Sequence, residues 1–394
     1  MAHLVYDREQ ILFVGESLPP NDVLNPGQRS PDAVLPRHTV LPGLIEAHAH
    51  LFLEGAELDA EKRAAYLKQN DGSLFSVANQ RLEKLVRIGV TAVRDAGDRN
   101  GVGLALSRMC SSNNRPLMPY VDSPGSAIHR RGRYGSFMGE PLEDFPSLRD
   151  CVAGRVSAGA DRIKLIPTGI INFQKGRVTA APQMTREDVV ELVRAAKDLN
   201  RQTFAHASGD DGIENVIEGG VDSVEHGFFV RDDQLARMRD RGIAWVPTFA
   251  PVQEQVDHAD QMGWDDSVVS HLRRILEQHA RSLAKAQVMG VQIIAGSDAG
   301  SCGVAHGLGF LHELELMERA GLRPLDVINA ATGTPARRLA FKEKFGLLKP
   351  GFRSRFILTQ HSPLETLSNL RQPRQVIFDG AVLENLPIAD AQGL

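Results

Sequence analysis

The sequence predicts an α/β fold, a (β/α)8 TIM barrel with a small β-domain beside it. Short apolar runs alternate with amphipathic stretches along most of the 394 residues, which is the pattern of repeated βα units around a parallel sheet. Side chains able to bind a metal ion follow several of these runs. The active site of such a barrel forms at the carboxyl ends of its strands, so the two observations point to the same fold.

Eight apolar runs have the length of a strand, and polar or glycine-rich residues bound most of them. The expected strands cover residues 40–45, 91–94, 118–122, 162–166, 202–205, 222–225, 243–246 and 291–295. Eight parallel strands are the number that closes the barrel.

Helical patterns lie between these runs. Thr185, with Asp188 three residues later, predicts a helix cap ahead of apolar side chains at helical spacing. Residues 270–289 show the same spacing over a longer stretch, and Pro324 introduces a further helix over 325–339. The predicted helices therefore connect consecutive strands, as βα units require.

Both ends of the chain depart from the barrel pattern. Residues 6–14, 345–358 and 375–382 read as short strands with Gly and Pro turns. We expect residues 1–40 and 345–394 to form a small β-sandwich-like domain, and residues 41–344 to form the barrel. Residues 125–146 lack any periodicity and follow the third strand, so we expect a long loop over the barrel mouth.

Composition excludes several classes of protein. The net charge is −4, with 24% charged and 42% hydrophobic residues, which fits a globular protein with a large core and gives no reason to expect a nucleic-acid partner. The apolar run 11–14 is too short to span a membrane or to serve as a targeting segment. The three separated cysteines are predicted to be reduced thiols of a cytoplasmic protein that acts on a small molecule.

His48 and His50 are separated by one residue at the end of an apolar run. Alternate residues of a strand point to the same face, so both imidazoles would converge and form half of a metal site. Taken alone, this spacing is better explained as chance at a polar strand end. Four further metal-capable side chains end other apolar runs: Lys164, His206, His226 and Asp298. This recurrence favours a metal centre.

Several segments resemble the metal-dependent amidohydrolase superfamily, in particular its imidazolonepropionase-like branch and its Xaa-Pro and Xaa-Arg dipeptidase branch. The matching segments are 42–50, 89–97, 159–164, 205–206, 225–227, 296–298, 313–336 and 346–351. The resemblance implies the barrel with a small β-domain. The chain departs from the relatives in a shorter N-terminal part and in Ser354-Arg355, where relatives usually carry Ala-Asp.

The resemblance implies that His48, His50 and Asp298 hold one divalent ion, and that His206 and His226 hold a second. Lys164 would bridge both as a carbamate formed with carbon dioxide. Desolvation between apolar neighbours favours the free amine that this reaction needs, whereas the alternative is an ordinary ammonium in solvent. Nitrogen and oxygen ligands without thiolate suit Zn²⁺, with cobalt, manganese or iron as alternatives.

The expected activity is hydrolysis of an amide-type carbon–nitrogen bond, peptide bonds included, by a hydroxide that bridges two metal ions. Asp298 would take the hydroxide proton and deliver it to the leaving nitrogen. A mononuclear deaminase is an alternative, but relatives of that kind lack the lysine and carry a glutamate shortly after the fifth-strand histidine, and residues 206–211 contain none. An inactive scaffold is another alternative, although such proteins have lost ligands.

Substrate contacts are expected in the loop after the third strand. This loop holds His129, Arg130, Arg131, Arg133 and Tyr134. Arginine grips carboxylates at two points, so we expect an N-acyl amino acid or a dipeptide as substrate. If these arginines are solvated or pair with acids downstream (Glu140, Glu143 and Asp144), neutral ureas, carbamates or cyclic amides become the better expectation.

Other positions carry weaker expectations. His306 could face the substrate or only cap a loop, and Glu225 and Arg94 match family positions where hydrogen-bonding partners are expected. Four histidines in helical or terminal segments are predicted to lie on the surface: His258, His271, His279 and His361. Relatives often assemble, so a homo-oligomer is expected.

Overall fold

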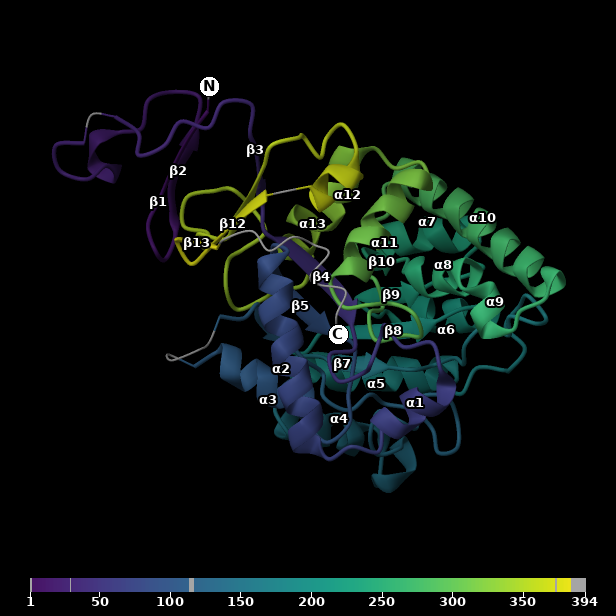
Figure 1. Cartoon of the computed structure of the whole chain (residues 1–394). Coiled ribbons are helices and arrows are strands. Elements are labelled where there is room, and N and C mark those ends of the chain that lie inside the picture. Colours follow the sequence, from purple (N-terminus) through teal and green to yellow (C-terminus); the bar gives the residue numbers. More distant parts are fainter. Residues whose placement is uncertain (1, 29, 113–116, 373, 384–394) are drawn as a thin grey trace.

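The computed structural model describes residues 2–28, 30–112, 117–372 and 374–383. Two parallel sheets lie at the centre, and helices surround them (Figure 1). The first sheet is formed by β4 (Leu44–Ala49), β5 (Val90–Asp95) and β6 (Tyr120–Asp122). The second sheet is formed by β7 (Ile163–Leu165), β8 (Thr203–Ala207), β9 (Ser223–His226) and β10 (Ala244–Val246). All residues of these strands are buried, as expected of parallel strands covered on both faces.

Backbone hydrogen bonds join the two sheets at two seams. At one seam Ile128 pairs in parallel with Leu165, and its amide donates to the carbonyl of Lys164 at 2.8 Å. At the other, residues 291–299 run between β10 and β4, where Ile293 pairs with Trp245 and Ala299 with Ala49. The predicted eighth strand is therefore an irregular segment that is hydrogen-bonded on both sides. The predicted barrel fold is confirmed.

The predicted first strand, 40–45, is wrong in its bounds because Gly43 divides it. Residues before the glycine form β3 (Thr39–Pro42), which belongs to the small sheet, and β4 starts directly after it. A Cβ atom at Gly43 would lie 2.1 Å from Cγ2 of Thr91, so the chain crosses too close to β5 for any side chain. Consequently His48 lies inside β4 and His50 directly follows it.

Thirteen helices are present in the described part of the chain. They are α1 (Ala60–Tyr66), α2 (Asp71–Arg87), α3 (Val102–Cys110), α4 (Leu148–Ser157), α5 (Arg186–Asp198), α6 (Asp210–Gly219), α7 (Asp232–Arg241), α8 (Ala250–Asp257), α9 (Ala259–Met262), α10 (Asp266–Met289), α11 (Leu308–Arg319), α12 (Pro324–Ala330) and α13 (Gly333–Arg338). The capping box of Thr185 and Asp188 starts α5 as predicted. The helix predicted over 325–339 is instead two short helices, α12 and α13. None of the described helices has the length and apolar character that crossing a bilayer requires.

Both ends of the chain contribute to the small β-structure. Its main sheet has the order β13-β12-β11-β3, with β11 (Phe356–Thr359), β12 (Arg374–Phe378) and β13 (Ala381–Leu383). The hairpin of β1 (His3–Tyr6) and β2 (Ile11–Gly15) lies beside this sheet (Figure 1). The domain limits at residues 40 and 345 remain a prediction.

Arg355 ties the small sheet to the barrel. Its guanidinium donates to both carboxylate oxygens of Asp379, at 2.8 and 3.0 Å, and to the carbonyl of Thr91 in β5 at 3.3 Å. It is fully buried and lies over the Phe378 ring. The departure from relatives at Ser354-Arg355 therefore supplies a contact between the two parts of the fold.

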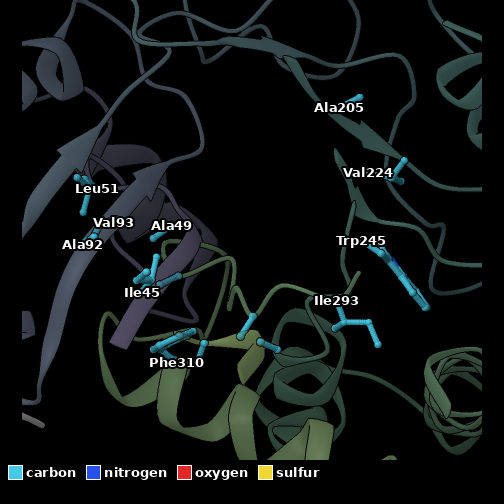
Figure 2. Packing of buried hydrophobic residues seen from close by; sticks show 14 of the residues in the cluster. Ile45, Ala49, Leu51, Ala92, Val93, Ala205, Val224, Trp245, Ile293 and Phe310 are labelled. Carbon is cyan, nitrogen blue, oxygen red and sulfur yellow. The ribbon is translucent and has the colours of Figure 1, made fainter. Parts of the chain in front are cut away.

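The hydrophobic core lies between the strands and the helices around them. Figure 2 shows Ile45, Val224, Trp245 and Phe310 among its buried side chains. Burying one such side chain contributes about 1.5–3 kcal/mol, so this core stabilises the barrel independently of the polar strand ends.

His279 of α10 is also buried, so the prediction that it lies on the surface is wrong. Its ring stacks on Phe228 at 4.0 Å, and its Nε2 donates to the carbonyl of Pro247 at 2.9 Å. The ring is therefore held in the core by an aromatic neighbour and by one hydrogen bond to the backbone.

Candidate metal centre

The six predicted metal ligands lie in or just after strands around the barrel. His48 lies in β4 and His50 directly follows it, Lys164 lies in β7, His206 in β8 and His226 in β9, and Asp298 lies near the end of the irregular eighth segment. Each is at most 8% exposed. Polar side chains so deeply buried need partners, since burying an unpaired polar group is unfavourable.

The described contacts bring these side chains together. Nε2 of His48 and Nε2 of His50 each lie 3.5 Å from Oδ1 of Asp298. The ring centroids of His48 and His226 are 5.0 Å apart, and those of His206 and His226 are 4.4 Å apart. Ligand atoms of His48, His226 and Asp298 all lie within 4.8 Å of one another, close enough to hold a metal ion.

Three buried atoms at this point have no hydrogen-bond partner in the described structure. They are Nε2 of His48, Nζ of Lys164 and Oδ1 of Asp298. Each unsatisfied buried group costs about 1–3 kcal/mol, so three in one place are unusual in a native protein. An imidazole nitrogen and a carboxylate oxygen suit a divalent cation. The residues present therefore fit a metal site.

Burial controls the protonation of these side chains. It lowers the pKa of Lys164 to about 8 and raises the pKa of Asp298 to about 7. Burial, followed by the charge of Lys164, lowers the pKa of His206 to about 3, and the pKa of His226 also lies well below its usual value because of burial. The histidines are therefore neutral ligands at physiological pH, and part of the Lys164 population is the free amine.

Hydrogen bonds orient the histidine rings. Nδ1 of His48 lies 2.6 Å from Oε2 of Glu225, and Nδ1 of His50 lies 2.9 Å from the carbonyl oxygen of Gly97. Since both oxygens only accept, each Nδ1 carries the proton and each Nε2 keeps its lone pair. His206 has the opposite arrangement, because its Nε2 donates to the carbonyl of Gly169 at 3.2 Å. Its free lone pair is therefore on Nδ1.

Glu225 is held by a second layer of buried groups. It accepts from Nη2 of Arg94 at 2.8 Å and from the hydroxyl of Ser223 at 2.6 Å. Arg94 also donates to the carbonyl of Ala47 at 2.6 Å. The expected role of Glu225 and Arg94 as hydrogen-bonding partners agrees with these contacts. Glu225 keeps His48 in a fixed tautomer, which is how carboxylates commonly support metal-bound histidines.

We predict that Glu225→Gln weakens metal binding by about 10–100-fold, because the charged partner of His48 is lost. Competition with a chromophoric chelator measures this affinity. Glu313→Gln is the matched control, since Glu313 is also fully buried but accepts from the amides of Phe249 and Ala250 rather than from a predicted ligand. Equal affinities of the two variants would contradict the role of Glu225.

Thr248 was not singled out from the sequence, although it follows the apolar run of β10 in the same way as the predicted ligands follow theirs. Its hydroxyl oxygen lies 2.7 Å from Nδ1 of His226. The backbone at His226, Thr248 and Asp298 has positive φ values of 67°, 52° and 58°. Left-handed backbone costs a side-chain-bearing residue roughly 1–2 kcal/mol, and such strain gathers at functional sites.

The three arginines after β6 already have protein partners. Arg130 pairs with Asp188 at 2.7 Å and with Glu143 at 3.3 Å, and Arg131 pairs with Asp144. Arg133 donates to the carbonyl of Ala181 at 2.7 Å. Pairing with downstream acids therefore describes Arg130 and Arg131, whereas Glu140 pairs with Arg155. A substrate role for these arginines stays a prediction.

The other expected substrate contacts lie in different surroundings. Tyr134 lies beside the centre, with its ring 5.1 Å from that of His206. His129 is buried inside its loop, where its two nitrogens face the carbonyls of Arg130 and Gly139 at 3.1 Å. His306 donates from Nε2 to the carbonyl of Leu53 at 3.0 Å.

Comparisons with known proteins show which family the chain belongs to. Residues 39–383 match the amidohydrolase family. An uncharacterised protein of Mycobacterium tuberculosis is 26% identical over 360 residues, which are 89% of this chain and 86% of that protein. Ochratoxinase of Aspergillus niger is 24% identical over 396 residues, covering 95% of this chain and 80% of the enzyme.

A solved structure of a Xaa-Pro dipeptidase with methionine bound in its active site superposes with a TM-score of 0.80. It is 26% identical, and the match covers 97% of this chain and 94% of the dipeptidase. The family match spans most of the chain and includes all six candidate ligands. The chain therefore belongs to the amidohydrolase family and is a hydrolase that acts on carbon–nitrogen bonds.

Proposed function

We propose that the protein is a binuclear metal-dependent hydrolase that cleaves an amide-type bond of an N-acyl amino acid or a dipeptide. One observation carries the proposal. Buried atoms of His48, Lys164 and Asp298 have no hydrogen-bond partner in the described structure. The other three candidate ligands, His50, His206 and His226, are buried in the same place. A pair of cations would satisfy these atoms, and the structure offers them no other partner within the described residues.

In this proposal His48, His50 and Asp298 would hold one divalent ion, His206 and His226 would hold the other, and Lys164, as its carbamate with carbon dioxide, would contribute to both. Such ions, with Zn²⁺ the best match to these side chains, would supply Lewis-acid chemistry that activates water and the substrate carbonyl. Asp298 would accept a proton from the attacking water and deliver it to the leaving nitrogen.

The substrate class is supported by the relatives rather than by the ligands. A dipeptidase that holds methionine is similar to this chain, and methionine carries a free carboxylate. Ureas, carbamates and cyclic amides remain the alternative on the same site, and the internal pairing of Arg130 and Arg131 favours them. A screen of N-acyl amino acids, dipeptides, ureas and lactams separates the two classes.

Metal analysis tests the proposal directly. We expect about two divalent ions per chain in fully active protein, as in two-metal hydrolases. His206→Ala should reduce the metal content and abolish hydrolysis while the fold is kept, since the hydrophobic core does not depend on this strand end. His258→Ala is the control, because the side chain of His258 is 39% exposed and pairs with Glu254 rather than with a candidate ligand. One ion or none in fully active enzyme would overturn the binuclear proposal.

A further inference from the structure

The segment between β4 and β5, which we call the first loop, contains α1 and α2. Arg63 of α1 differs from the nearby cations Lys62 and Arg81 in having no acidic partner among the described residues. Its Nη1 donates to the carbonyls of Glu54 and Glu57, and its Nη2 donates to the carbonyl of Gly300 at 2.8 Å. No carboxylate lies within ion-pair distance of it among the described residues. Its neighbours are paired, Lys62 with Glu57 at 3.4 Å and Arg81 with Glu54 at 2.8 Å.

The position of Arg63 is fixed from two sides. Asp59 caps α1 by accepting from the amides of Glu61 and Lys62, at 2.8 and 3.0 Å, which sets the start of this short helix. The contact with Gly300 then attaches the guanidinium to the loop that follows the eighth segment. The side chain is half-buried between these two loops.

Gly300 also brings Arg63 close to the candidate metal centre. It follows Asp298 by two residues, and a Cβ atom added to it would lie 3.0 Å from Cβ of His50 and 2.8 Å from the carbonyl oxygen of His50. Its backbone has φ of 100°, which a side chain would strain. Gly300, whose carbonyl accepts from Arg63, therefore packs against His50 and lies two residues after Asp298.

Two donors of this guanidinium remain without an acceptor in the described structure. Arginine has five N–H groups, and three are used by the carbonyls, which leaves Nε–H and one hydrogen of Nη2. Carbonyls are neutral, so they orient the cation without cancelling its charge. A half-buried arginine with free donors is suited to a carboxylate from outside the chain.

We propose that Arg63 binds the free carboxylate of the substrate at the rim formed by the first and last loops of the barrel. This inference rests on the proposed amide hydrolysis and names the side chain that selects acidic substrates. It places the carboxylate on the side of His50 and Asp298 rather than on the loop after β6 that carries Arg130 and Arg131. Those two arginines already have acids of the protein as partners.

The test compares pairs of substrates that differ only at the carboxylate. N-acetyl derivatives of leucine, methionine, phenylalanine and proline are each assayed beside their primary carboxamides. We expect Arg63→Met to lower kcat/KM for the carboxylates by about 10–100-fold, the value of a charge-assisted bond, and to leave the carboxamides within about twofold. Arg63→Lys should retain part of the preference for carboxylates over carboxamides, because lysine keeps the positive charge but cannot donate at two points as a guanidinium does.

Lys62→Met is the matched control, since it removes the same charge from the adjacent, exposed position of α1 and should change neither substrate class. An equal loss for both classes in Arg63→Met would mean that Arg63 only joins the two loops, and the proposal would be overturned. Loss of preference in Arg133→Met instead would place the carboxylate on the loop after β6.

Direct binding separates failure of this inference from failure of the proposed function. If the wild-type protein hydrolyses no pair, calorimetry with the same N-acetyl amino acids and carboxamides is carried out on the metal-loaded protein. Tighter binding of the carboxylates that Arg63→Met abolishes would support the subsite without amide hydrolysis. Absence of any carboxylate preference in the wild type would overturn it.

Discussion

Replacing Asp298 with asparagine is expected to lower kcat/KM by about 1,000-fold or more, the upper range for loss of a general acid–base group that also contacts a metal ion. Asparagine has the same shape and tolerates left-handed backbone well, and the φ value at this position is 58°. The variant should therefore keep the fold. Steady-state kinetics on any substrate found by screening, together with thermal unfolding, measures both effects.

A matched variant separates chemistry from general damage. Asp198→Asn makes the same change at the exposed end of α5, where the carboxylate pairs with Arg149 at 2.8 Å, and should leave kcat/KM unchanged. Activity of Asp298→Asn within tenfold of the wild type would exclude the proton-transfer role. A large fall in its unfolding temperature would instead mean that the carboxylate is needed for stability.

Lys164→Met is expected to remove metal and activity together while stabilising the metal-free protein. Lys164 is 2% exposed, and its amine has no hydrogen-bond partner among the described residues and lies 4.7 Å from the centroid of the Phe204 ring. Methionine fills similar space without an unpaired polar group, so metal-free Lys164→Met should gain about 1–3 kcal/mol over metal-free wild type. Elemental analysis and chemical denaturation in the presence of chelator give the two measurements.

The carbamate has its own test in Lys164→Ala. This variant leaves space near the centre, and short carboxylic acids such as acetate or propionate should restore part of the metal content and activity by supplying the missing oxygens. The same acids should have no effect on Lys164→Met, in which the space is filled. Electron density for an unmodified lysine in active, metal-loaded enzyme would rule out the carbamate bridge.

The sequence was sufficient for the barrel and for the convergence of the polar side chains, because both follow from periodicity. A strand that is buried on both faces must be apolar until it reaches the mouth, so a histidine or aspartate that ends such a run stands out. This reasoning located His206, His226 and Asp298 without knowledge of any contact. Thr248 satisfies the same rule, but threonine is common in strands, so the rule does not distinguish it from an ordinary strand residue.

Some features could not be predicted from periodicity, because they depend on contacts between residues far apart in the sequence. Gly43 ends one strand and starts another only because the chain passes Thr91 there. His279 is buried because Phe228 comes from another part of the ring. The partners of Arg130 likewise include Asp188, 58 residues away. Local sequence carries no signal for any of these three contacts.

The division of the candidate ligands between the two sheets has a consequence for how the barrel unfolds. His48 and His50 lie in or directly after a strand of one sheet, Lys164, His206 and His226 belong to the other, and Asp298 lies in the segment between β10 and β4. Any ion bound by this set would connect both sheets and the segment that closes the ring. A ligand that binds only the folded state stabilises that state, so such an ion would hold the barrel closed as well as supply its chemistry.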